Sequence, residues 1–439
     1  MANITQLQQT MTILLTEIAD QLAKESGVII RERKLKGSTF AQALIFGFLS
    51  KPEATYSELS QSAASVEVWI SKQGLEQRLT LKAAEFFRLL LDKMVSYQFV
   101  SQSKVQPLLD RFQGVFIRDS SIIQLPKELS EVWQGVGGSQ GENAALKLQV
   151  CIEYARGSLQ GPYLQDGRIH DQKSPLDRLE LPAGALDLAD LGFFNLDVFQ
   201  QQSQKDIFWI TRYKAGTYLY FSDGRPLSLL TWLKAQKANQ IELPVLVGAQ
   251  HRIPCRLLAA KVPQEVADQR RRRLREYARK KQVALRPELL ALADWTLVIT
   301  NVPEEKLSLR EALILLRIRW QVELLFKLWK SQGKIDEWRS QKPARILCEI
   351  YAKLIGLVIM QWILIINLWK NADRSLVKAM KVVQKFALTI ALFFRNETML
   401  TEVLDKLQKC IQADSRIEKR RKKHSAFQLL NSCLPNGNA

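Results

Sequence analysis

The sequence predicts an α/β fold, in which a mixed sheet with an inserted β-rich region is flanked by helical regions at both ends of the chain. Three observations support this prediction. The first hundred or so residues show helical periodicity, alternating β-branched residues begin at Val115, and the chain after Val302 is helical again to near its end. At 439 residues, the chain is long enough for two or three domains.

The N-terminal region places apolar residues such as Leu14, Leu15, Ile18 and Leu22 at helical spacing, and no strand pattern interrupts it. Residues 57–80 within this region indicate two short helices joined by a turn, the second with a polar face. Such a pair suits a helix-turn-helix that binds a DNA groove. It suits an ordinary helical hairpin with a solvated polar face equally well.

Strand patterns fill the middle of the chain. VFIRDSSIIQL (115–125), KLQVCIEY (147–154) and DIFWITRYK (206–214) predict strands of one sheet, with a polar Gly-rich loop between the first two and a helix at 196–204. Further strand-like runs at ELPVLVGA, IPCRLLAAKV and WTLVIT exceed what a small α/β sheet needs. We therefore expect an inserted β-rich region, with the basic segment 269–281 as a helix beside it.

The chain is strongly basic, with 63 Lys and Arg against 44 Asp and Glu and a formal net charge of +19. A charge of this size indicates a polyanionic partner, and double-stranded DNA is the leading candidate. Clusters such as QRRRRLREYARKK (269–281) and IEKRRKKH (417–424) favour this explanation over a surface that is basic only for solubility. Each cluster also suits a solvated face, and neither specifies a base sequence.

Cysteine usage and hydropathy indicate a reducing, non-membrane setting. The five cysteines lie far apart without a C-x-x-C pair, which argues against a disulfide framework or a zinc site. The first 20 residues lack the pattern of a secretory signal, so we expect a cytoplasmic protein. Residues 354–369 are very apolar but shorter than the roughly 20 residues of a membrane span. We expect a buried core helix there, with a membrane-associated basic protein as the alternative.

Several kinds of chemistry lack their motifs. There are three His residues without an acidic neighbour in a motif, and there is no G-x-S-x-G, P-loop or dinucleotide fingerprint. This leaves carboxylate and metal chemistry. Mg²⁺ and Mn²⁺ prefer hard oxygen ligands, so such a site needs two or three Asp or Glu side chains from separate elements.

The segment LRIRWQVELLFKLWK carries Arg319, Glu323 and Lys330, whose spacings of four and seven residues place them on one helical face. A carboxylate between two cations suits a metal ion held beside the phosphates of a nucleic-acid strand. By spacing alone, an Arg/Glu pair on a solvated helix is the commoner explanation.

This segment resembles the Tyr-x2-Arg-x3-Glu-x6-Lys signature of DDE transposases of the insertion-sequence-four type, with Arg319, Glu323 and Lys330 on its Arg, Glu and Lys. VFIRDSS resembles the strand with that family's first catalytic Asp, which gives this role to Asp119. DLADLGFFNLDVF resembles the block with its second Asp, which gives that role to Asp190. The 133 residues from Asp190 to Glu323 agree with the β insertion that the family has before its Glu helix.

Other segments extend the resemblance. FWITRYK resembles the family's Phe-x-x-Arg-x-Lys strand, which implies phosphate contacts from Arg212 and Lys214. WTLVITNVP resembles a strand where the best-known members carry a Trp that stacks a flipped base, which implies a DNA contact from Trp295; a buried core Trp is an equally good explanation. Two positions depart from the family pattern: Leu316 replaces the signature Tyr, and Leu191 replaces an Arg that often follows the second Asp.

Each acid also has another explanation. Asp119 suits a turn at a strand end. Asp190 suits a cap of the following helix, and Asp187, Asp197 and Asp206 are nearby competitors for its role.

The resemblance implies an RNase H-like sheet and a two-metal mechanism in which Asp119, Asp190 and Glu323 hold Mg²⁺, with Mn²⁺ as a substitute. The implied activity is the cleavage of insertion-sequence ends and their joining to target DNA. The implied partners are double-stranded DNA, as terminal inverted repeats and as target, and a second copy of the chain in a homodimer. A transposase-derived protein that binds DNA without cutting it is the alternative.

These expectations divide the chain into five regions. They are a helical DNA-binding region (1–110), the first part of the RNase H-like catalytic core (111–214), the β-rich insertion with its basic segment (215–294), the second part of the core with the Glu helix (295–345), and the C-terminal helical region with a basic tail (346–439).

Overall fold

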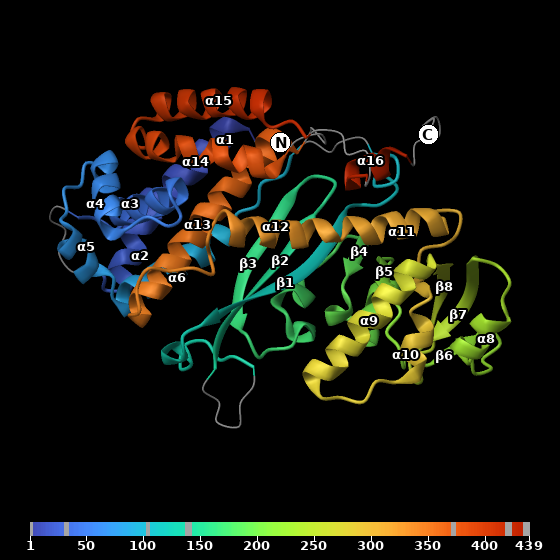
Figure 1. Ribbon diagram of the computed structural model, residues 1–439. Coiled ribbons are helices and arrows are strands. Elements are labelled where there is room, and N and C mark those ends of the chain that lie inside the picture. The colour runs from blue at the N-terminus through green and yellow to red at the C-terminus, as the bar shows by residue number, and fades with distance from the viewer. Residues whose placement is uncertain are drawn as a thin grey trace. The chain divides into compact units, whose positions relative to one another are not determined.

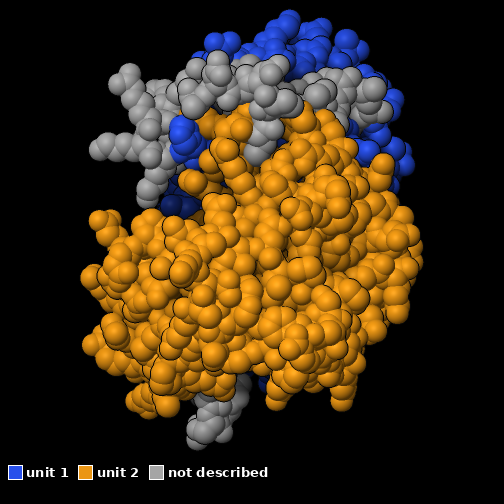
Figure 2. Space-filling model, turned by 90° about the vertical axis from the view of Figure 1, so that its right-hand side faces the viewer, with its two compact units in different colours: residues 1–105, 119–169, 321–427 blue, residues 106–118, 170–320, 428–439 orange. Residues whose placement is uncertain are grey.

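The computed structural model describes residues 3–29, 35–101, 106–136, 143–369, 375–417 and 424–432. The chain divides into two compact units, which Figure 2 shows in different colours. The first unit comprises Met1–Val105, Asp119–Ile169 and Gln321–Phe427, and the second comprises Gln106–Arg118, His170–Trp320 and Gln428–Ala439. Each unit is built from stretches that lie far apart in the sequence. The five regions expected from the sequence stay a prediction.

Helices make up most of the first unit (Figure 1). They are α1 (Ile4–Ile13), the π-helical turn η1 (Leu14–Ile18), α2 (Ala19–Glu25), α3 (Gly37–Ser50), α4 (Tyr56–Ser62), the 3-10 turn η2 (Ala63–Val66), α5 (Lys72–Arg78), α6 (Leu81–Val95), α12 (Trp320–Ser331), α13 (Pro343–Leu368), α14 (Leu376–Leu392) and α15 (Glu397–Asp414). The helical regions predicted before and after the sheet are thereby confirmed.

The core of these helices is built around α3 and α13. Gly37 begins α3 where it meets α2, and a Cβ atom at this position would lie 2.6 Å from the carbonyl oxygen of Ala19, so glycine is required for the close approach. Within the described ranges, α13 is the one helix long and apolar enough to cross a membrane. All of its most apolar 18-residue window is buried, mainly against α6 and α3. α13 is thus a buried core helix, as the apolar residues 354–369 predicted.

Three strands belong to the first unit. β2 (Ala144–Glu153) and β3 (Ser158–Asp166) are antiparallel, and β2 lies between β3 and β1 (Val115–Leu125), which enters this unit at Asp119. The 3-10 turn η3 (Lys127–Leu129) follows β1. Every residue of β2 is buried, and α6 and α13 contact β3, so the helices cover this part of the sheet.

The second unit contains the strand order β1-β4-β5-β9-β8-β7-β6. Its strands are β4 (Leu186–Ala189), β5 (Phe208–Arg212), β6 (Leu219–Phe221), β7 (Gln240–Val247), β8 (Ile253–Lys261) and β9 (Trp295–Thr300), together with the start of β1. The β1–β4 and β4–β5 pairs are parallel and the remaining pairs are antiparallel, which confirms the predicted mixed sheet. The strands expected as an insertion extend this sheet from β9 outward.

Helices and turns connect these strands. They are η4 (Asp171–Lys173), η5 (Pro175–Arg178), η6 (Leu191–Phe193), α7 (Leu196–Gln204), α8 (Leu229–Ala235), α9 (Gln264–Lys281), α10 (Pro287–Leu292) and α11 (Leu309–Ile318); α16 (Ala426–Asn431) lies near the C-terminus. α7 packs Phe199 against Trp209 of β5, with ring centroids 4.6 Å apart. This pair belongs to the hydrophobic core formed with β7, β8 and β9.

Some sequence predictions of elements were incomplete. The strands β3, β4 and β6 were not predicted, because β3 contains Gly161 and Pro162, which indicate a turn, and β4 and β6 are too short to show an alternating pattern. The segment 57–80 does form two short helices, α4 and α5, and a DNA-binding role for them stays a prediction. Most of the basic tail IEKRRKKH, and residues 137–142 of the predicted loop, lie outside the described residues.

Candidate active site

Asp119 lies within β1, at the point where the strand emerges from the core. The four residues before it are buried, and Asp119 and the two residues after it are half-buried. Its carboxylate accepts a hydrogen bond of 2.8 Å from the backbone N–H of Ser120. Because six strand residues follow Asp119, the alternative of a turn residue at a strand end is wrong.

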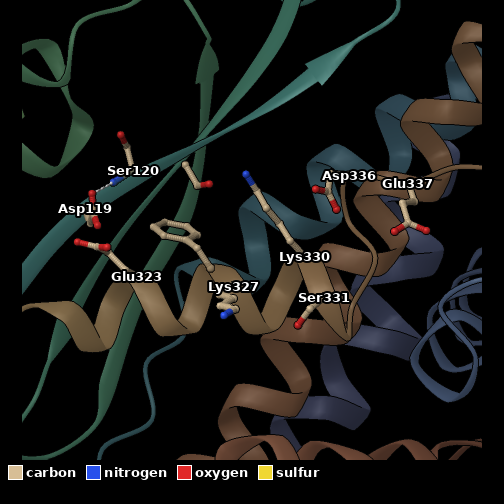
Figure 3. A pocket seen from close by; sticks show the side chains of 10 residues that line it. Asp119, Ser120, Glu323, Lys327, Lys330, Ser331, Asp336 and Glu337 are labelled. Carbon is tan, nitrogen blue, oxygen red and sulfur yellow. Dashed lines mark hydrogen bonds between the residues drawn. The ribbon is translucent and has the colours of Figure 1, made fainter. Parts of the chain in front are cut away.

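Glu323 lies in the first turn of α12 and shares a pocket with Asp119 (Figure 3). The two carboxylates point toward one another in Figure 3, one from the strand and one from the helix. The full lining consists of Asp119, Ser120, Ser121, Glu323, Phe326, Lys327, Lys330, Ser331, Asp336 and Glu337. Two carboxylates from separate elements in an open pocket are donors of the kind that Mg²⁺ and Mn²⁺ prefer.

Lys330 lines the same pocket, two helical turns beyond Glu323. Its ammonium group donates a hydrogen bond of 2.9 Å to the backbone carbonyl of Ile122 in β1. Lys327 lies between them on the helix and also lines the pocket. The predicted helical spacing therefore brings Glu323 and Lys330 to one face of α12, opposite the strand of Asp119. Arg319, which the sequence placed on the same helix, instead lies at the end of α11, before α12 begins.

Asp190 lies in the second unit, directly after β4. It precedes η6, and its side chain makes no capping hydrogen bond there. The helix that follows, α7, is capped by Asn195, whose side chain accepts from the N–H of Asp197 at 3.0 Å. The alternative that Asp190 caps the following helix is therefore wrong. Its carboxylate instead lies 3.6 Å from the guanidinium of Arg319, which is almost fully buried.

Two of the competing aspartates, Asp187 and Asp197, have other partners. Asp187 is completely buried, and the guanidinium of Arg118 donates two hydrogen bonds to its carboxylate. The side-chain amide of Gln202 donates a third, at 2.7 Å. Asp197 pairs with His251 at 2.8 Å on the surface. Of these aspartates, Asp190 is the one that lies directly at the end of β4 with its side chain 39% exposed.

Cations surround the loop after Asp190. Lys214, two residues beyond the end of β5, lies over the ring of Phe194 with its nitrogen 5.6 Å from the centroid. The guanidinium of Arg118 lies over Phe193, 5.3 Å from the centroid. The last residue of β5, Arg212, is exposed. The two residues expected to contact phosphates are thus at the end of β5 and in the turn after it.

Trp295 begins β9 and is half-buried against the hydrophobic core of the second unit. Its backbone carbonyl accepts a hydrogen bond from Arg270 at 2.9 Å. This environment is that of a core residue, and a base-stacking role for Trp295 stays a prediction. Leu316, at the signature's Tyr position, is buried on α11.

The three expected metal ligands are not grouped within one unit. In the ranges that the structure describes, no three His, Cys, Asp or Glu side chains lie close enough together to hold an ion. The first unit joins Asp119 and Glu323 in its pocket, and Asp190 belongs to the second. The oxygen donors of the pocket nevertheless fit a divalent cation in kind.

The sequence analysis did not identify several polar residues that line the pocket of Asp119 and Glu323 or lie near Asp190. Lys327 follows Glu323 by four residues, so helical spacing alone indicated its place. Asp336 and Glu337 line the far end of the pocket and belong to no motif. The role of Arg118 as the partner of Asp187 required the parallel pairing of β1 with β4, which the sequence did not show.

Comparison with known families identifies the class of the protein. Residues 110–359 match the transposase DDE domain, which is more than half of the chain. The chain therefore belongs to the transposase DDE domain family. This confirms the resemblance that the motifs indicated.

Relatives are similar over nearly the whole chain. The transposase for insertion sequence element IS231C of Bacillus thuringiensis subsp. berliner is 26% identical over 448 residues, which cover 95% of this chain and 93% of that protein. The transposase for IS1151 of Clostridium perfringens is 24% identical over 446 residues, covering 94% and 92%. A putative transposase InsL for IS186A of Escherichia coli (strain K12) is 27% identical over 190 residues, covering 41% and 51%.

Proposed function

We propose that the chain is a DNA transposase that cleaves the ends of an insertion sequence and joins them to target DNA by metal-dependent phosphoryl transfer. The observation that carries this proposal is the pocket in which Asp119 of β1 and Glu323 of α12 point toward one another beside Lys330. The names of the relatives, which are transposases for insertion sequence elements, support it.

Asp190 is proposed as the third carboxylate, and the strand register supports its assignment. Arg118 pairs with Ala189 in the parallel β1–β4 ladder. Asp119 is the next residue of β1, and Asp190 directly follows the last residue of β4. Because these two positions are neighbours on adjacent parallel strands, we propose that both acids contribute to one site with Glu323.

When bound, a pair of Mg²⁺ or Mn²⁺ ions lowers the pKa of an attacking hydroxyl and neutralises charge on the leaving oxygen. Asp119, Asp190 and Glu323 would supply the oxygen ligands. Water attack breaks the bond between the scissile phosphorus and the 3' oxygen, which leaves a free 3'-hydroxyl. That hydroxyl then attacks a second phosphodiester and releases its leaving oxygen as an alcohol.

The cations are proposed to hold DNA during these steps. Arg319, Lys330, Arg212 and Lys214 would neutralise the charge of phosphates near the scissile bond. The guanidinium of Arg319 lies 3.6 Å from the carboxylate of Asp190, so Arg319 would also orient this proposed metal ligand. The proposed partners are terminal-repeat and target duplexes, with a homodimer as the active complex, and the proposed location is the bacterial cytoplasm at the nucleoid.

The Glu323→Gln variant tests this function. Because it removes a metal ligand and keeps the shape of the side chain, we expect cleavage of terminal-repeat DNA in Mg²⁺ to fall by at least about 1,000-fold, the effect of losing roughly 4 kcal/mol of transition-state stabilisation. DNA binding should stay within a few-fold. Glu337→Gln is the matched control, since it removes a carboxylate from the far end of the same pocket and should retain cleavage.

The same assay separates the two candidate functions. A transposase-derived protein that only binds DNA would show no nicking by the unmodified chain in Mg²⁺ or Mn²⁺. Nicking that survives in Glu323→Gln would contradict the assignment of Glu323.

A further inference from the structure

Helix α9 concentrates positive charge. Its 18 residues include eight Arg or Lys against three Asp or Glu, so this one helix carries +5 of the chain's net charge of +19. Helix α15 has the same length and includes two Lys against four Asp or Glu. The basic charge is therefore not spread evenly over the helices of the chain.

The buried side of α9 uses two arginines to attach the helix to the segment around the start of β9. The guanidinium of Arg270 donates to the carbonyl of Trp295 and to the hydroxyl of Thr296, each at 2.9 Å. Arg271 forms ion pairs with Asp268 and Asp294 at 2.8 and 2.5 Å. These contacts determine which side of α9 faces the rest of the second unit.

Arg272, Arg273 and Arg275 are all exposed in the middle of the helix, with Arg272 and Arg273 turned away from the anchored side and Arg275 one turn after Arg271 at its edge. Among the described residues, no carboxylate forms an ion pair with any of the three. The helix dipole explains cations in the last turn, such as Arg279 to Lys281, but its stabilisation does not reach mid-helix positions. Neighbouring like charges on a helix repel one another. Asp268 and Glu276 lie one turn from Arg272 without pairing with it, so no contact within the described part of the fold accounts for the three arginines.

The positive surface continues toward the loop of Asp190 within the second unit. Burial and the positive charge of Arg212 lower the pKa of Arg270, which indicates that Arg212 lies near the anchored side of α9. Lys214 follows two residues later and lies over Phe194, four residues beyond Asp190. Positive charge is therefore found both beside the loop that follows Asp190 and beside α9.

We propose that the exposed arginines of α9, Arg272, Arg273 and Arg275, bind the phosphates of the duplex DNA that flanks the cleavage site, independently of its base sequence. The proposal rests on the proposed function for the identity of the polyanion as DNA. Duplex DNA carries one charge per about 1.7 Å, and the three arginines span roughly 5 Å of helix axis, so their long side chains can reach several phosphates.

The test is the salt dependence of DNA binding by the full chain with the substitutions R272A, R273A and R275A combined. Binding to a terminal-repeat duplex and to an unrelated duplex of equal length is measured by fluorescence anisotropy in EDTA. Each lost phosphate contact should make the slope of log K against log salt shallower by about 0.9, and thus by up to about 2.7 for the triple variant, on both duplexes. Alanine favours helix, so the melting temperature should stay equal or rise.

The matched control removes three exposed lysines of the first unit by the substitutions K381A, K385A and K409A. It changes the net charge equally, and its slope should stay within about 0.5 of the unmodified chain. An unchanged slope in the arginine variant, or the same change in the lysine control, would overturn the proposal. A loss confined to the terminal repeat would also overturn it, because α9 would then read bases.

These outcomes are independent of the metal chemistry. Failure of the proposed cleavage would appear in the Glu323→Gln experiment and would leave the slopes in EDTA unaffected. Failure of α9 as a phosphate-binding surface would leave Mg²⁺-dependent nicking unchanged in the arginine variant.

Discussion

At the scale of single residues, Asp187 and Asp190 show how the partner of a side chain decides its role. They lie three residues apart in one short segment, and apart from the family resemblance no local pattern separates them. Asp187 is completely buried and accepts hydrogen bonds from Arg118 and Gln202. Asp190 is partly exposed, beside Arg319. A buried, fully bonded carboxylate serves the fold, whereas an accessible carboxylate is able to bind an ion.

This difference predicts that two equivalent substitutions lower the free energy of unfolding by different amounts. Asp187→Asn should lower the free energy of unfolding by about 3 to 5 kcal/mol, because it leaves the charge of Arg118 buried without its counter-charge. Asp190→Asn should lower it by about 1 kcal/mol or less, since the carboxylate is exposed and 3.6 Å from its partner. Urea denaturation measures both values.

The cleavage assay completes the comparison. Asp190→Asn should abolish Mg²⁺-dependent nicking in a protein that remains folded. Equal losses of stability in the two variants, or full nicking by Asp190→Asn, would contradict the roles assigned to these aspartates.

At the scale of elements, helix α11 begins with a capping box formed by Ser308 and Glu311. A residue from a distant part of the sequence, Arg111, also contacts this capping box. Glu311 accepts from the N–H and hydroxyl of Ser308 at 3.0 and 2.9 Å. Arg111 donates two more hydrogen bonds to the same carboxylate, at 3.0 and 2.8 Å. Because Arg319 caps the C-terminus of α11, these contacts help to fix where that cation lies.

The lowered pKa of Glu311 makes the stability of the first turn of α11 depend on pH. Burial acts to raise the pKa, but the hydrogen bonds from Arg111 and Ser308 outweigh it, so the folded-state pKa is below its ordinary value. A depressed carboxylate pKa stabilises the fold above the unfolded pKa of about 4.3, and this stabilisation is lost as the pH falls through the folded-state value.

The Glu311→Gln variant should therefore be less stable by about 1 to 2 kcal/mol at pH 7. The difference in stability between the variant and the unmodified chain is measured by thermal unfolding at pH 7, 5 and 3. It should have its full size at pH 7 and be smaller at pH 3. Glu85→Gln, which breaks an exposed pair with Arg88, is the control and should cost less than about 1 kcal/mol. A difference that grows toward pH 3 would contradict the proposed linkage.

Elements also differ in how well the sequence predicted them. Helix α7 was predicted with its observed bounds, because an apolar face at helical spacing and a polar capping residue are both local signals. The strand β4, with four residues, was not predicted although it carries the aspartates to their places. Its strand conformation depends on pairing with β1 and β5, which come from distant parts of the sequence.

At the scale of the whole molecule, a buried ion pair joins the core helix of the first unit to the segment that lines the pocket. Lys353 of α13 donates to the carbonyls of Lys334 and Glu337 and to the carboxylate of Glu349, at 3.0, 2.8 and 2.8 Å. Both members of this ion pair are 2% exposed. Burial lowers the pKa of Lys353, and the charge of Glu349 opposes that shift. The pair attaches the segment that lines the far end of the pocket to the core helix.

Breaking this pair should destabilise the first unit. Lys353→Met alone should cost about 3 to 5 kcal/mol in urea denaturation, because Glu349 is left as a buried, uncompensated charge. The double variant Lys353→Met, Glu349→Leu should recover part of that loss. A double variant less stable than the single one would contradict this account, because it would show that Glu349 stabilises the unit through its other contact, the hydrogen bond from the N–H of Arg339, by more than its unpaired charge costs.

The sequence by itself determined the types of most elements, the basic character of the chain, and the common face of Glu323 and Lys330. These properties depend on periodicity and composition, which are local along the chain. Only the tertiary structure decided that Asp187 is a structural partner of Arg118, that Trp295 packs against a core, and which arginines of α9 remain exposed. Burial and pairing depend on residues far away in sequence, and no local pattern encodes those partners.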